Sequence, residues 1–155
     1  MNRVTSHTIA RLEQTRILLT DIHGTMENFL NETTVTGLVE SLPDADRNYY
    51  AGILSSLRRL AVFSEEGIEI CNRIKKQNDF EVKAEKALQW VFLRCVEEFF
   101  SPKGDFWYEN SRAAYTGNLS IRFHFFVPDK IKDLFSTLEK PFGELREELE
   151  LYQAS

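Results

Sequence analysis

The residues best suited to chemistry lie in a short stretch rich in aromatic side chains. Arg122 and His124 alternate with phenylalanines, and alternate side chains of an extended strand point to opposite faces. Arginine can bind a carboxylate or phosphate through two parallel hydrogen bonds, and tryptophan or tyrosine offers a large, rigid contact surface. We therefore predict a partner- or ligand-binding surface made of Trp107, Arg112, Tyr115, Arg122 and His124.

The sequence leaves a second interpretation of these residues open. Trp107 can instead pack on a helix while the arginines form ion pairs with surface acids. An enclosed, partly apolar pocket with converging polar groups would favour ligand binding. A flat strand face or a long apolar groove would favour a protein partner.

Other catalytic or metal-binding patterns are weak or missing from the sequence. His23 and Glu27 share a face of an expected helix, but two ligands do not make a metal site. The sequence contains no phosphate-binding glycine loop, no Gly-x-Ser-x-Gly motif and no Cys-x-x-Cys pair. We therefore expect no catalytic residue set, no metal site and no cofactor.

The two cysteines occupy apolar positions of expected helices. Cys71 and Cys95 are therefore interpreted as buried free thiols. The alternatives are a disulfide and a reactive thiol.

Composition limits the class of protein. The chain has 155 residues, a net charge of −5 and a pI near 5.3, which argues against a broad basic surface for nucleic acid or an anionic membrane. No leader pattern is apparent, and no apolar run approaches the ~18 residues of a membrane span. We expect a cytoplasmic protein with residues 1–155 in a single domain.

The longest apolar stripe predicts a helix over residues 44–76. Apolar and small residues recur there at gaps of three and four, which keeps one face toward a core. Ser64 followed by two glutamates could instead cap a new helix, with Gly67 easing the break. Further stripes predict helices over 6–31, 35–42, 82–100 and 128–152, the last with Pro141 inside it.

Period-two alternation from Leu119 predicts a strand, with a partner strand at 106–110 and a turn near Gly117. The predicted fold is mainly α: a bundle of about four main helices around a long central helix. One antiparallel β-hairpin, at about 106–127, is inserted before the C-terminal helix, and a hairpin of this size must dock on the helices to be stable.

Three segments carry a family resemblance. The runs LRRLAVFSEEGIEICN, AYTGNLSIRFHFFVP and LEKPFGELREELELY resemble the YpuI-type family of Bacillus-like bacteria. The resemblance covers most of the chain from residue 44 onward and is loosest in the first thirty residues. It implies a bacterial cytoplasmic protein and assigns no activity, cofactor or catalytic residue.

Two functional hypotheses from different classes follow. The first is a non-enzymatic protein-interaction or regulatory module, whose partner is another protein or a second copy of the chain. The alternative is a small-molecule-binding protein, or an enzyme, that holds an anionic ligand in a pocket near the hairpin.

Overall fold

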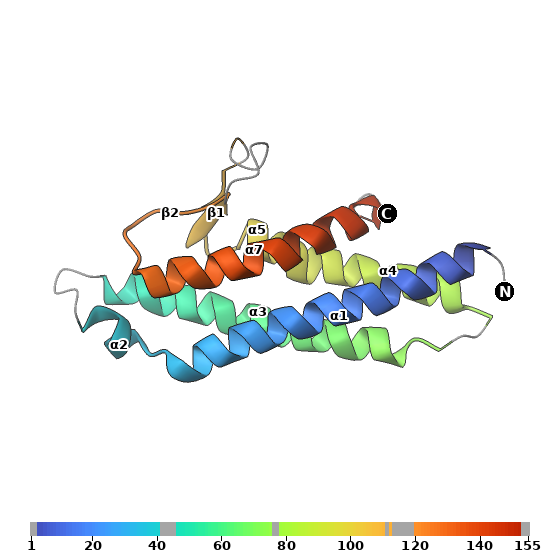
Figure 1. The fold of residues 1–155 in the computed structure, drawn as a ribbon, viewed down its shortest axis with the longest axis horizontal. Helices are drawn as coiled ribbons and strands as arrows, with labels where there is room; N and C mark the ends of the chain where they lie inside the picture. Colours follow the sequence, from blue (N-terminus) through green and yellow to red (C-terminus); the bar gives the residue numbers. More distant parts are fainter. Residues whose placement is uncertain (1–2, 41–45, 76–77, 111, 113–119, 153–155) are drawn as a thin grey trace.

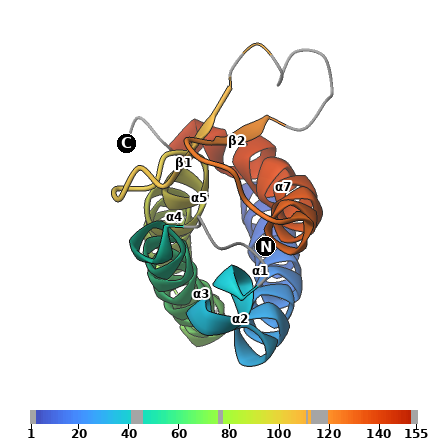
Figure 2. The same cartoon turned by 90° about the vertical axis from the view of Figure 1, so that its left-hand side faces the viewer.

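A computed structural model describes residues 3–40, 46–75, 78–110, 112 and 120–152 (Figure 1). The long helices α1 (Arg3–Glu32), α3 (Arg47–Arg73), α4 (Phe80–Val91) and α7 (Asp129–Leu149) run along the long axis. Seen from one end in Figure 2, they form the sides of a bundle, with the short α2 (Val35–Val39) at that end. The predicted helical bundle, with a hairpin before the C-terminal helix, is confirmed.

Helix α3 is continuous through the point where a break was an alternative. Its N-cap is Asp46, whose side chain accepts a hydrogen bond from the Tyr49 amide at 3.2 Å. Ser64 is fully buried and donates its hydroxyl to the Leu60 carbonyl, so it does not cap a helix. A Cβ on Gly67 would lie 2.9 Å from Leu19 of α1. Gly67 therefore allows close packing of α1 on α3.

Gly24 differs from Gly67, although both lie inside helices. A Cβ added to Gly24 would meet no heavy atom within 4 Å. Gly24 therefore does not mark a close approach of two helices.

The fourth side of the bundle contains a change of helical type. Helix α4 passes into a π-helical segment (Phe92–Val96) and then α5 (Glu97–Phe100). A π turn holds an extra residue, which moves the apolar face around the helix axis. This shift accounts for the burial of Phe92, Cys95, Val96 and Phe99 within one short helical stretch.

Helix α7 continues through Pro141 and ends in a 3-10 turn, Glu150–Tyr152. Proline has no backbone N–H, so one intrahelical hydrogen bond is lost at this position. Pro141 and Phe142 are buried in the bundle. Burial of this apolar pair compensates for the missing hydrogen bond.

The hairpin consists of β1 (Trp107–Glu109) and β2 (Ile121–Phe123), paired antiparallel with Trp107 opposite Phe123. Its predicted turn lies outside the described residues. The strand β2 ends at Phe123, so the period-two alternation of the sequence, which runs on through His124 and Phe125, extends beyond the strand. Phe125 and its neighbour Phe126 are 61% and 66% exposed and do not continue the buried face.

Two consecutive tyrosines of α3 explain where the strand ends. The Tyr49 hydroxyl donates to the Phe106 carbonyl at 2.5 Å, and the Tyr50 hydroxyl donates to the Phe126 carbonyl at 2.9 Å. Phe125 packs edge-on against the Tyr49 ring at 4.9 Å between centroids. The chain after Phe123 is therefore held by α3 and leaves β1.

One hydrophobic cluster includes side chains from the long helices and from both strands. Among the described residues, no helix is long and apolar enough to cross a membrane.

Candidate functional site

The two faces of the hairpin differ in chemistry. Because residues directly opposite each other share a face, the pairing places Trp107 beside Phe123 on one side and Tyr108 beside Arg122 on the other. Trp107 is fully buried, whereas Tyr108 is 40% exposed. The first face docks on the bundle and the second faces away from it.

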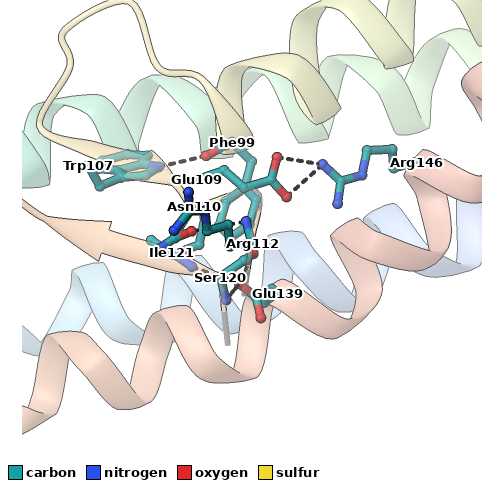
Figure 3. Close-up of polar contacts among 9 residues, drawn as sticks. All are labelled: Phe99, Trp107, Glu109, Asn110, Arg112, Ser120, Ile121, Glu139 and Arg146. Carbon is teal, nitrogen blue, oxygen red and sulfur yellow. Dashed lines mark hydrogen bonds and ion pairs between the residues drawn. The ribbon is translucent and has the colours of Figure 1, made fainter. Parts of the chain in front are cut away.

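Trp107 belongs to the docked face. Its indole Nε1 donates to the Phe99 carbonyl at 2.6 Å (Figure 3), and its ring meets the Phe135 ring edge-on at 4.7 Å. Phe123 contacts the same Phe135 ring at 5.0 Å. The expectation that Trp107 gathers with Arg122 and His124 is therefore wrong, and the alternative packing interpretation holds for this residue.

Two other predicted site residues, His124 and Arg122, take part in different contacts. His124 stacks near Tyr108 at 4.9 Å and lies 3.3 Å from the Asp105 carboxylate. Arg122 turns toward the strand edge, where its Nη1 donates to the Ile121 carbonyl at 3.1 Å.

Arg112 and Tyr115 lie in or beside the connection between the strands. Arg112 is exposed, and its amide donates to the Asn110 side chain at 3.0 Å (Figure 3). Tyr115 lies outside the described residues.

A hollow near the hairpin lies between β2 and α7. This hollow, here called the β2–α7 groove, has a volume of about 350 Å³. Most of its walls are aromatic or aliphatic, and three residues carry charge. It is lined by Ile121, Arg122, Phe123, Phe125, Phe126, Val127, Lys132, Phe135, Ser136 and Glu139.

Glu139 of α7 joins the helix to the start of β2. Its Oε1 accepts hydrogen bonds from the amides of Ser120 and Ile121 at 2.8 Å and 3.0 Å, and from the Ser120 hydroxyl at 2.7 Å (Figure 3). Charge-assisted hydrogen bonds of this kind are stronger than neutral ones. The carboxylate is therefore a structural acceptor.

The mouth of the groove combines exposed aromatic rings with positive charge. The Lys132 ammonium lies 5.7 Å from the centre of the Phe126 ring, within cation–π range. Arg122 adds a second positive side chain to the lining. Since the only acid among the described lining residues is Glu139, the groove favours an apolar group with a negative charge beside it.

Sequence reasoning missed Lys132, Glu139 and the role of Phe126. One signal was present: two adjacent phenylalanines break a period-two pattern, so one of them had to leave the buried face. Lys132 and Glu139 had no such signal, because they look like ordinary surface charges of a helix.

A second polar cluster lies at the opposite edge of the hairpin. Arg146 Nη1 approaches both carboxylate oxygens of Glu109, at 2.8 Å and 2.9 Å (Figure 3). Its guanidinium also stacks 3.7 Å from the centre of the Phe100 ring. The charges of Arg146 and Glu109 are therefore paired with each other within the fold. This ion pair fastens β1 to α7.

The cysteines and His23 show no reactive arrangement. Burial raises the pKa of the Cys71 thiol to about 11 and also raises the pKa of Cys95. Both are free and buried, as predicted. His23 lies 3.5 Å from Glu27 and 3.7 Å from Glu65. Within the described part of the chain, no group of three or more such side chains is arranged to hold a metal ion.

Comparison with known proteins gives a family but no activity. Residues 12–155 match the family described as "Protein of unknown function (DUF3907)". The uncharacterized protein YpuI of Bacillus subtilis strain 168 is 44% identical over 147 residues, which cover 94% of this chain and 82% of that relative. No solved structure matches. The resemblance to YpuI-type proteins is thus confirmed, and the chain belongs to the DUF3907 family of proteins of unknown function.

Proposed function

We propose that this chain is a non-enzymatic protein-interaction module and that the β2–α7 groove is its binding site. Its occupant is a short segment of another protein that carries apolar side chains next to acidic ones. The observation that carries this proposal is the lining: apolar walls with Arg122 and Lys132 as the positive residues.

The size and exposure of the groove support a peptide segment as the occupant. A volume of about 350 Å³ is at the lower end of ligand pockets and suits one or two apolar side chains. Phe125 and Phe126 extend this apolar surface outward, since both are more than half exposed. Large exposed apolar side chains that adjoin a pocket are typical of interaction sites.

The chemistry of the lining favours binding over catalysis. Neither histidine nor cysteine occurs among the described lining residues. The Glu139 oxygen that faces β2 already accepts three hydrogen bonds. A general base needs to reach the proton that it removes, and this carboxylate is committed to the strand.

A small anionic metabolite is the second candidate occupant. It is favoured by the same two cations at the mouth of the groove, where a guanidinium and an ammonium can hold a carboxylate or phosphate. A thermal-shift screen against metabolites tests it, because a ligand of the folded state raises the melting temperature.

The decisive experiment for the proposal is peptide selection from a random display library on the full chain. Selected peptides are compared on the wild type, on Lys132→Glu and on Lys140→Glu. Lys140 is an exposed lysine of the same helix outside the groove lining, so its variant carries the same charge change.

We expect selected peptides to be rich in apolar and acidic residues. Their affinity should fall about tenfold or more with Lys132→Glu, since reversing a charge beside a desolvated contact costs more than about 1.4 kcal/mol. Lys140→Glu should bind like the wild type. Equal effects of the two variants, or no enrichment above background, would reject the groove as the binding site.

A further inference from the structure

We infer that the partner segment binds as a third β-strand on the outer edge of β2, as an extended segment in which apolar and acidic residues alternate. This inference rests on the proposed function, because it states how the same groove takes its partner. It is argued from the hydrogen bonds along β2 and from the side chains on its two faces.

The pairing shows which backbone groups of β2 point away from β1. The Asn110 amide donates to the Ser120 carbonyl at 2.7 Å, and hydrogen-bonded pairs alternate along antiparallel strands. Tyr108 and Arg122 therefore form the next hydrogen-bonded pair. The N–H and C=O groups of Ile121 and Phe123 then point to the outer edge, toward the groove that both residues line.

Side chains of the fold already occupy half of this edge. The Ile121 amide donates to Glu139 at 3.0 Å, and the Ile121 carbonyl accepts from Arg122 at 3.1 Å. Such side-chain cover is a common way to protect an edge strand from aggregation. Among the described residues, no side chain or backbone group covers the outward groups of Phe123 in this way. The open part of the edge is thus one residue long and faces the groove.

Strand geometry then fixes the pattern of the partner. A residue placed opposite Phe123 shares its face, so its side chain enters the groove beside Phe123 and Phe135. The residues before and after it point to the other face, where Arg122 lies. The positive charge of Arg122 favours acidic residues at those positions. An apolar residue flanked by acids satisfies both faces.

Charge also decides between a partner protein and a second copy of this chain. Two copies paired through their β2 edges would bring together two sets of Arg122 and Lys132. The acid of the groove, Glu139, is already held by three donors. Like charges across an interface are unfavourable. An acidic strand from another protein fits this edge better.

The test uses one capped heptapeptide of alternating valine and glutamate as its probe. Two isomers carry the same number of N-methyl groups, one on valine amides and the other on glutamate amides. An N-methyl group removes one donor and blocks one edge of a strand, and these two sets of amides lie on opposite edges. Binding to the full chain is measured by calorimetry, with Lys132→Glu and Lys140→Glu as the matched protein variants.

Strand addition predicts that one isomer loses about tenfold or more in affinity while the other binds like the parent peptide. Loss on valine methylation indicates an antiparallel partner, and loss on glutamate methylation a parallel one. Equal affinity of the isomers, or no saturable binding of the parent, would overturn the inferred strand. A dimer of the chain with protected β2 amides would overturn it in favour of self-pairing.

The two proposals fail in different ways. If selected peptides respond to Lys132→Glu but the N-methyl isomers behave alike, the groove is the binding site and strand addition is wrong. If neither Lys132→Glu nor the position of methylation matters, both proposals are wrong.

Discussion

Glu139 shows how one side chain determines the shape of a strand edge. Its Oε1 accepts three hydrogen bonds at the start of β2, from the amides of Ser120 and Ile121 and from the Ser120 hydroxyl. Without Glu139, these donors would need another acceptor. A buried or half-buried N–H group without an acceptor costs about 1–3 kcal/mol. Glu139 therefore contributes to the fold, although its sequence context resembles a surface acid.

Replacing Glu139 by alanine should destabilise the protein. We expect the free energy of unfolding to fall by about 1–3 kcal/mol, because the Ser120 and Ile121 amides lose their acceptor. Urea unfolding followed by circular dichroism measures the change. Glu144→Ala, at an exposed position of the same helix, is the control and should change stability by less than about 0.5 kcal/mol. Equal losses for both variants would contradict this role.

The Cys71 thiol should react slowly in the folded protein. Its pKa is raised from 9.0 to about 11 by burial, so near pH 8 its thiolate fraction is lower by roughly 100-fold. Labelling with a thiol-specific disulfide reagent, with and without urea, measures this. Fast labelling of Cys71 in the folded state would contradict it.

The raised pKa of the Cys71 thiol also makes the stability of the fold depend on pH. The pKa of Cys71 is higher in the folded than in the unfolded protein. Its contribution to the free energy of unfolding is therefore constant below pH 9 and decreases as the pH rises toward about 11.

At the scale of elements, the hairpin is held by contacts from distant parts of the chain. Tyr49 and Tyr50 bind the carbonyls of Phe106 and Phe126, which lie 57 and 76 residues further along the chain. Trp107 adds a hydrogen bond to Phe99. An isolated hairpin is only marginally stable in water. These contacts explain why a hairpin with such short strands is stable in this protein.

Two glycine-to-alanine variants distinguish the effect of helix propensity on stability from the effect of packing the hairpin region against α3. A Cβ on Gly52 would lie 2.1 Å from the Phe106 ring, whereas Gly24 has open space. We expect Gly52→Ala to destabilise by about 1–3 kcal/mol, because the ring must move. Gly24→Ala should stabilise by about 0.4–1 kcal/mol. Thermal melts of both variants measure this, and a stabilised Gly52→Ala would show that the hairpin does not pack tightly on α3.

The elements themselves could be predicted because each has a local signal. The apolar stripe of α3 has the helical period, and it continues in phase through Ser64, as the structure shows. The alternation around Ile121 and Phe123 predicted β2. The end of β2 could not be predicted, because it depends on the hydroxyls of Tyr49 and Tyr50 far away in the sequence.

The candidate site was predicted only in part. Arg122 lines the groove, but Trp107 is buried on the docked face and His124 pairs with Asp105. Which face a strand residue takes depends on register, and register depends on the docking of the whole hairpin. Lys132 and Glu139 become site residues only because α7 passes beside β2.

At the scale of the whole molecule, the charge of the groove lining is opposite in sign to the net charge of the chain. The chain carries a net charge of −5, yet two of the three charged residues that line the β2–α7 groove, Arg122 and Lys132, are positive. Charges in solution are screened from one another beyond about 8–10 Å. An acidic residue of a partner therefore feels the positive side chains of the groove only if it lies close to the apolar residues that enter the groove.

The most direct test of the groove is an amide map by nuclear magnetic resonance. The ¹⁵N-labelled protein is titrated with the valine–glutamate heptapeptide, and the shifts of all assigned amides are followed. We predict that the largest changes occur at Ile121, Phe123, Phe126 and Lys132, and that the Phe123 amide becomes protected from hydrogen exchange. Changes centred on another surface, such as that around His23, or an unprotected Phe123 amide at saturation, would contradict the account.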